Sequence, residues 1–352
     1  MAEPKKFVVQ ALKFVAPGTP LRESLEQIVK AKTGALIVIG ESEKLKPIMN
    51  GGFPLDIEFT PNRLYELSKM DGAIILSKEA KKILYANVML LPDPNIPSSE
   101  TGARHATAER VARQIGCLVI SVSQRKDTIT LFQNDWKYVL RDVGEILTKA
   151  SQALQTMERY RNIYDDLLNR LNSLELENQV NLYDVLIFLH RACMLFTIHK
   201  EVENYLIELG IEGRLIEIQL EALLAGVKEE TILVIKDYKR KPTEADEILK
   251  ELLDNFKGNF QEFAIVAGEI LGYKKEEIEI SILVTPRGYR ILNRITSIPS
   301  AIIDNIVEYF GSLPKIIESS FEDLDNIEGV GEVRAKKIRE ALSRLQRISS
   351  VF

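Results

Sequence analysis

The chain has 352 residues, of which 45% are hydrophobic and 28% charged, and its formal net charge is -5. This composition is typical of a globular protein with two or three domains. The acidic balance argues against a protein that coats nucleic acid along its whole length, but it allows a local basic patch. Cys117 and Cys193 lie far apart, which argues against a disulfide framework and favours a reducing compartment. The apolar runs are too short to span a bilayer and no secretory signal follows the N-terminus, so we expect a cytoplasmic protein.

Residues 7 to about 140 alternate short apolar runs with amphipathic stretches. Apolar, β-branched runs bounded by turn residues are typical of buried strands. The amphipathic stretches predict helices, most clearly where Ala108, Val111, Ala112 and Ile115 follow the spacing of one helix face. The alternation predicts an α/β domain with a central mixed sheet. Strands are expected at 35–39, 73–76, 83–91, 117–122 and 128–132, and helices at 21–31, 64–70 and 108–115.

The middle of the chain predicts long helices, because 145–209 contains neither glycine nor proline. Apolar residues recur every three or four positions over 147–171, interrupted at Arg161, which indicates one long helix. A second helical segment is expected at about 185–209. The simplest interpretation is a structural spine, and the alternative is a helix pair that sets the geometry of an oligomer. Beyond it we expect a helix at 214–224, a strand at 232–235 and a turn at Pro242.

The region from about Pro286 holds two similar pairs of helical patterns, each joined by a short break. The second break, Ile327-Glu328-Gly329-Val330-Gly331, resembles a helix-hairpin-helix element, in which glycines permit a tight hairpin whose backbone N–H groups point at a DNA phosphate. The first break, around Pro299, lacks the glycine pair. The alternative is a small helical packing module. The residues predicted to bind DNA without reading its bases are Gly329, Gly331, Arg334, Lys336 and Lys337, with Arg339 on the same helix.

Three segments of the N-terminal region carry groups suited to phosphate or metal chemistry. In Met70-Asp71-Gly72-Ala73, a carboxylate at the mouth of a strand can hold a divalent metal, and glycine lets a ligand approach the backbone. Thr101-Gly102-Ala103-Arg104-His105-Ala106-Thr107 enters a helix, where free N–H groups, the helix dipole and Arg104 favour an anion. The third, 92–99, is a stiff proline-rich loop. Structural turns and an ordinary capped helix are the alternatives.

Taken in this order, the segments resemble the diadenylate cyclase family, whose members carry an Asp-Gly-Ala motif and then a Gly-Thr-Arg-His-Arg-Thr motif entering a helix. Gly51-Gly52-Phe53, the segment 64–70 and the region from Asn87 to Gly102 are similar too. The resemblance continues through the helical spine and the paired hairpin units. It therefore covers nearly the whole chain and matches the DNA-integrity scanning branch, not the membrane-anchored branch.

The resemblance implies that two cyclase domains face each other with one ATP each. The 3′-hydroxyl of each nucleotide attacks the α-phosphate of the other, which gives cyclic di-AMP and two pyrophosphates. Asp71 would bind Mg²⁺ or Mn²⁺ and is a catalytic residue together with Arg104 and His105. The implied partners are ATP and cyclic di-AMP, branched or damaged DNA, and copies of the chain in a homo-octamer, with no membrane and a nucleoid-associated location. The implied nucleotide-binding residues are Gly72, Ala73, Leu90, Ala103, Arg104, His105, Ala106, Thr107, Ser123 and Arg125.

The sequence departs from the family motif at Ala103 and Ala106, where the family has threonine and arginine. An alanine cannot donate the charge-assisted hydrogen bonds of the missing arginine. Losing one such preorganised donor typically costs about 100- to 1,000-fold in rate. We expect ATP binding to be weakened but retained, and cyclase activity to be low or absent unless neighbouring groups compensate. The rival hypothesis is a DNA-binding scaffold that keeps the cyclase fold for assembly or nucleotide sensing.

The predicted architecture is a multidomain α/β and all-α protein. The α/β diadenylate cyclase domain with its central mixed sheet is expected at 1–142. The helical spine is expected at 143–285 and the helix-hairpin-helix domain at 286–352.

Overall fold

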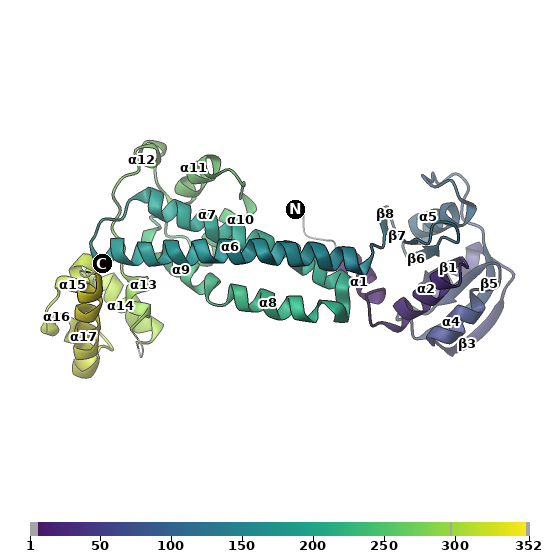
Figure 1. Cartoon of the computed structure of the whole chain (residues 1–352), viewed down its shortest axis with the longest axis horizontal. Helices are drawn as coiled ribbons and strands as arrows, with labels where there is room; N and C mark the ends of the chain where they lie inside the picture. The colour runs from purple at the N-terminus through teal and green to yellow at the C-terminus, as the bar shows by residue number, and fades with distance from the viewer. Residues whose placement is uncertain (1–5, 296–297, 350–352) are drawn as a thin grey trace. The chain divides into compact units, whose positions relative to one another are not determined.

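The computed structural model describes residues 6–295 and 298–349 (Figure 1). The chain divides into two compact units, Met1–Ser151 with Glu203–Glu217, and Gln152–Val202 with Ile218–Phe352. The long helices α6 (Val143–Leu176) and α7 (Leu182–Leu209) therefore each contribute residues to both units. The domain boundaries at 142 and 285 stay a prediction, since they come from motif order and not from contacts.

A mixed sheet forms the centre of the first unit, as predicted, and it has eight strands where the sequence patterns predicted five. Its strand order is β2-β5-β4-β1-β6-β7-β8, and β3 pairs with β5. Strand β1 is parallel to β4 and antiparallel to β6. The strands are β1 (Ala35–Ile39), β2 (Met49–Asn50), β3 (Phe53–Glu58), β4 (Ala73–Leu76), β5 (Lys82–Leu90), β6 (Leu118–Val122), β7 (Ile129–Gln133) and β8 (Trp136–Val139).

Both faces of this sheet are covered, which explains the continuous apolar run of β1. Ile37 packs with Leu25 and Ile28 of α2 in one core, and Val38 packs with Val111 of α5 in the other. All five residues of β1 are consequently buried. The helices of this unit are α1 (Lys6–Phe14), α2 (Pro20–Lys30), α3 (Ser42–Leu45), η1 (Lys46–Ile48), α4 (Pro61–Leu67) and α5 (Ala103–Ile115).

Sequence patterns missed β2, β3 and β8; β2 has only two residues, and β3 and β8 are half-exposed. Strand β8 alternates intermediate and exposed residues, and β3 has no fully buried residue. Neither β3 nor β8 shows the continuous apolar run that marks β1 or β4. Trp136 of β8 packs instead on the ring of Tyr138, with centroids 5.7 Å apart.

The helical spine confirms the two long helices predicted between 145 and 209. Ala150, Leu154, Met157, Tyr164 and Leu171 of α6 are buried, so the three-to-four spacing marks a packed face. Contrary to the expectation from the apolar runs, the stretch Leu182–Tyr238 is long and apolar enough to cross a membrane by length and composition alone. Its apolar window has a mean hydropathy of 1.3, and 56% of that window is buried inside the fold, as in the core helix of a soluble protein. The next helices are η2 (Gly210–Gly213), α8 (Arg214–Leu224), α9 (Val227–Tyr238), α10 (Ala245–Asp254), α11 (Phe260–Leu271) and α12 (Lys275–Glu279).

The predicted strand at 232–235 is wrong, because these residues lie in helix α9. The buried residues of this helix include Val227, Thr231, Val234 and Tyr238, which share one face at helical spacing. Four consecutive apolar residues fit a buried strand and a buried helix equally well. The helical spacing of the buried residues before and after 232–235 distinguishes the helix from a strand.

The C-terminal region forms a helical tip with its own apolar core, which includes Ile306, Leu313 and Ile338. The two predicted helix pairs are present as α13 with α14 and α16 with α17, and α15 between them was not predicted. The helices are α13 (Tyr289–Asn293), α14 (Ser300–Phe310), α15 (Leu313–Glu318), α16 (Phe321–Asp325) and α17 (Gly331–Ser349).

A buried polar network attaches the tip to the spine within the second unit. Arg290 of α13 forms an ion pair with Glu175 of α6, and neither side chain is exposed to solvent. The hydroxyl of Tyr238 donates to the same carboxylate at 2.8 Å. Asp237 accepts hydrogen bonds from the backbone N–H groups of Gly288 and Tyr289, both at 2.7 Å, at the start of α13. The first helix of the tip is thus anchored through its side chain and its N-terminus.

Candidate active site

The strand registers bring the predicted site segments to one edge of the sheet. Leu36 of β1 pairs with Ala73 of β4, and Ala73 pairs with Val88 of β5. Ala35 pairs with Val122 of β6. The residues that precede β1 and β4, the end of β5 and the residues that follow β6 therefore share an edge. They include Gly34, Asp71, Gly72, Leu90 and Ser123.

Gly72 is required by the close approach of β5. Its φ is +95°, and a Cβ there would lie 2.9 Å from the carbonyl carbon of Asn87 and 3.0 Å from the backbone nitrogen of Val88. The preceding Asp71 is exposed and has no hydrogen bond or ion pair with any other residue that the structure describes. The carboxylate is therefore available at the mouth of β4, while Ala73 is buried in the sheet.

Helix α5 begins at Ala103, five residues before the predicted start at 108, so most of the motif 101–107 lies within its first turns, and its N-terminus is open. The N-cap is Gly102, which has no side chain to cap the first N–H groups. These N–H groups and the helix dipole favour an anion at this end. Thr107 lies on the second turn. Ala103 is exposed and Ala106 half-buried, and neither methyl group offers a donor.

Arg104 and His105 project from the first turn of α5 into different surroundings. The half-buried guanidinium of Arg104 lies against Gly34, just before β1, with no hydrogen bond or ion pair among the described residues. The ring of His105 meets the edge of Phe132, with centroids 6.3 Å apart. Burial lowers the pKa of His105, and the positive charge of Arg104 lowers it further. The imidazole is therefore neutral at pH 7, and Arg104 carries the positive charge.

The turn after β6 places Ser123 and Arg125 beside the start of β1. The hydroxyl of Ser123 accepts a hydrogen bond from the backbone N–H of Lys126 at 3.2 Å, so it shapes the turn. Arg125 is exposed. An ion pair between Lys32 and Asp127 ties this turn to the residues ahead of β1. Ser123 and Arg125, which the resemblance implied as nucleotide-binding residues, therefore follow β6 at the same edge of the sheet as Asp71.

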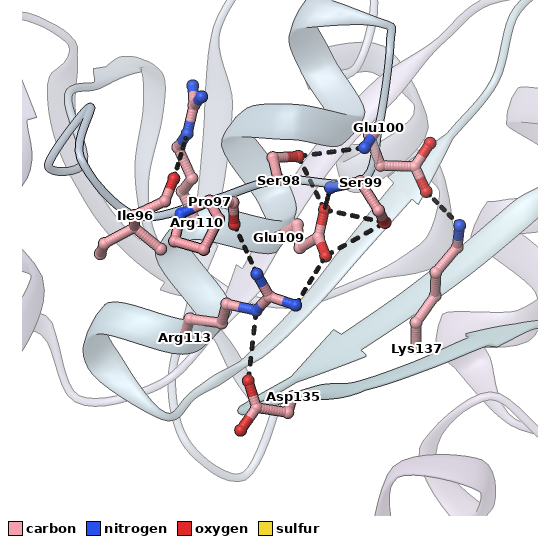
Figure 2. A network of polar contacts seen from close by, with 10 residues as sticks. All are labelled: Ile96, Pro97, Ser98, Ser99, Glu100, Glu109, Arg110, Arg113, Asp135 and Lys137. Atoms are coloured by element: carbon pink, nitrogen blue, oxygen red, sulfur yellow. Dashed lines mark hydrogen bonds and ion pairs between the residues drawn. The ribbon is translucent and has the colours of Figure 1, made fainter.

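A clamp that the sequence interpretation missed holds the loop 92–99 against α5 (Figure 2). Glu109 of α5 is buried, and it accepts hydrogen bonds from the Ser98 hydroxyl at 2.7 Å and the Ser99 backbone N–H at 2.8 Å. Arg113 pairs with Glu109 at 3.0 Å. Burial alone would raise the pKa of Glu109, but the bonds from Ser98 and Ser99 outweigh it and hold that pKa below its ordinary value. The sequence feature that could have revealed this clamp is the acidic Glu109, which lies beside the apolar positions of the α5 face.

A cavity of about 190 Å³ lies at the opposite edge of the sheet from the motifs. Gly40, which follows β1, and Cys117, which precedes β6, are among its lining residues. Burial raises the pKa of Cys117 to about 12, so this thiol stays protonated. None of the predicted site residues lines the cavity, so the chemistry is assigned to the motif edge.

The second hairpin of the tip has the backbone geometry that its glycines predicted. Gly329 and Gly331 have φ values of 83° and 62°. Arg334 donates to the carbonyl of Gly329 at 2.7 Å and so closes the hairpin. Lys336 and Lys337 are exposed on α17. Arg339 instead donates to the backbone carbonyls of Ser319 and Ile317 and packs the tip.

Comparisons with known proteins identify the family. The family model described as DisA bacterial checkpoint controller nucleotide-binding matches residues 22–136, and the one described as DisA bacterial checkpoint controller linker region matches 140–279. The chain is 52% identical over 336 residues to the DNA integrity scanning protein DisA of Bacillus subtilis (strain 168), which covers 95% of this chain and 93% of that protein. The chain belongs to the DisA family.

A second relative of the same name, from Carboxydothermus hydrogenoformans, is 50% identical over 341 residues, which is 96% of this chain and 97% of that protein. A solved structure of DacA from Staphylococcus aureus covers 39% of this chain at 19% identity with a TM-score of 0.29, which is too distant to add to the assignment. As a member of the DisA family the chain is a diadenylate cyclase, a nucleotidyltransferase whose family uses ATP and a divalent metal ion and interacts with DNA.

Proposed function

We propose that the chain condenses two ATP molecules into cyclic di-AMP and two pyrophosphates at the motif edge of its sheet. The observation that carries this proposal is the strand register, which gathers Asp71, Gly72 and Leu90 beside the turn containing Ser123, while Arg104 of α5 reaches the start of β1. A carboxylate, an open helix N-terminus and a guanidinium that has no partner among the described residues would then face one ligand. These groups suit a nucleotide triphosphate with its metal ion.

The residues of this edge act by positioning and by neutralising charge. Arg104, the N–H groups of α5, the neutral His105 and Thr107 hold the phosphates. A single exposed carboxylate, Asp71, fits Mg²⁺ or Mn²⁺, because such ions commonly take one or two protein carboxylates and complete their shell with phosphate oxygens and water. When bound, the ion would neutralise charge on the phosphates.

The reaction itself requires self-association. The 3′-oxygen of one nucleotide forms a bond to the α-phosphorus of the other, the bond from that phosphorus to pyrophosphate breaks, and the hydroxyl proton is released. Because each edge holds one ATP, two cyclase domains must face each other. We propose that this happens in a homo-octamer, in a cytoplasmic, nucleoid-associated protein.

Ala103 and Ala106 are proposed to make turnover low or absent while ATP binding persists. Cyclic di-AMP formation from ATP with Mn²⁺ tests this in the chain and in the double variant Ala103→Thr and Ala106→Arg. Restoring the arginine should raise the rate by about 100-fold or more. The same double variant with Asp71→Asn is the matched control and should stay inactive. Turnover by the unaltered chain as high as that of the double variant would refute the impairment.

The rival function is a DNA-binding scaffold that senses nucleotide without turnover, and Ala103 and Ala106 are the observation that favours it. A double variant that still makes no cyclic di-AMP, although the chain binds ATP, would support the scaffold. A nucleotide-soaked crystal structure would show directly whether ATP lies beside Asp71 and faces a partner chain.

We also propose that the tip binds branched or damaged DNA through its second hairpin. Lys336 and Lys337 would contact phosphates without reading bases. Replacing both with alanine should weaken binding equally for different sequences and lower the salt dependence of log K by about 1–2. Lys250→Ala, an exposed lysine on α10, is the control. Unchanged DNA affinity after loss of both lysines would contradict this assignment.

A further inference from the structure

Gly34 occupies the position on which the Arg104 side chain rests. A Cβ at residue 34 would lie 1.9 Å from Nη1 of Arg104, 2.7 Å from Cζ and 3.1 Å from Nη2. Non-bonded atoms do not approach a Cβ as closely as 1.9 Å. Any other residue at position 34 would therefore displace this guanidinium from its present place.

The backbone conformation at position 34 does not require a glycine. Gly34 is absent from the glycines with φ in the left-handed region, so an L-residue could adopt its conformation. A Cβ at this position meets the far end of a flexible side chain and no backbone atom among its nearest contacts. The absence of a Cβ at Gly34 therefore makes room for the Arg104 guanidinium, and the backbone conformation does not need it.

The surroundings of Gly34 make the position of this guanidinium consequential. Ala35 pairs with Val122, so Gly34 stands level with Ser123 at the motif edge. The guanidinium of Arg104 is half-buried and has no partner among residues 6–295 and 298–349, which leaves its N–H donors available to a ligand. With alanine at 106, Arg104 is the one arginine of the motif 101–107. Its placement therefore decides where a positive charge meets the phosphates.

We propose that Gly34 is a positioning residue of the cyclase site. Its missing side chain lets the guanidinium of Arg104 lie across the start of β1, with its donors directed to the phosphates of the bound nucleotide. The inference rests on the proposed function, because it takes the ligand to be ATP. Gly34 lies outside both motifs, and in this proposal it places the charged guanidinium that Arg104 of the motif 101–107 supplies.

The test is ATP affinity, measured by calorimetry with ATP and Mn²⁺ on the full chain. Gly34→Ala should weaken binding by about tenfold, the size expected for one lost charge-assisted hydrogen bond. The thermal unfolding midpoint should stay unchanged, because Arg104 can move aside. Gly258→Ala is the matched control, since a Cβ there meets nothing within 4 Å, and it should bind ATP like the unaltered chain.

A double-mutant cycle separates this role from a general structural one. Arg104→Ala should weaken binding, and adding Gly34→Ala to it should cause no further loss, because the side chain that the new methyl group would displace is gone. Full ATP affinity in Gly34→Ala, or an equal further loss in the Arg104→Ala background, would overturn the positioning role alone. An unaltered chain that binds no ATP would overturn the proposed function and this role with it.

Discussion

Replacing Glu175 with leucine should destabilise the second unit strongly. The substitution leaves the guanidinium of Arg290 buried without its counter-charge, since both side chains have 0% exposure. Removing one partner of such a pair costs about 3–5 kcal/mol. The hydroxyl of Tyr238 also loses its acceptor, which adds about 1 kcal/mol. The sum, about 4–6 kcal/mol, corresponds to a fall of roughly 10–20 °C in the unfolding midpoint of a unit of this size.

Calorimetric unfolding of the full chain measures this shift, and ATP affinity reports whether the first unit stays intact. The double variant Glu175→Leu and Arg290→Met should recover most of the loss, because an apolar pair can replace a buried ion pair at little cost. Asp246→Asn is the control, since its pair with Lys228 has side chains 68% and 60% exposed, and it should leave the transition unchanged. A double variant as unstable as Glu175→Leu, or an unchanged transition in the single variant, would refute the reasoning.

Three further predictions concern other contacts of the chain. Glu109→Ala should loosen the loop 92–99 at Ser98 and Ser99, because alanine offers no acceptor for their hydrogen bonds, so amide hydrogen exchange at Ser99 should quicken; unchanged exchange would contradict the clamp. Gly72→Ala should cost about 1–3 kcal/mol or more in urea unfolding, and more than Gly51→Ala, whose added Cβ meets nothing within 4 Å. Burial and the Glu175 carboxylate raise the pKa of Asp237 from 3.8 to about 7, so its ionisation opposes folding. The unaltered chain should therefore lose stability relative to Asp237→Asn as pH rises from about 4 to 7; a difference that is constant with pH would contradict this.

Local sequence patterns were most informative where burial is uniform. The run 35–39 is apolar because β1 is covered on both faces, and its interpretation as a strand is confirmed. The similar run at 232–235 is buried inside α9, and there the same pattern misled. An apolar run records burial, and it does not record which backbone hydrogen bonds form. Strand β3 was missed for the converse reason, since it is mostly exposed.

The sequence by itself determined the family of this protein. The Asp71-Gly72-Ala73 motif, the helix entry at 101–107 and the two alanines within it are local features, and the family followed from their order. Only the tertiary structure showed which other residues contact these motif segments. Gly34 meets Arg104, and Glu109 holds the loop 92–99, through strand pairing and helix packing between distant parts of the chain. These contacts depend on the register between strands and on how α5 packs over them, and no local pattern of residue types encodes either one.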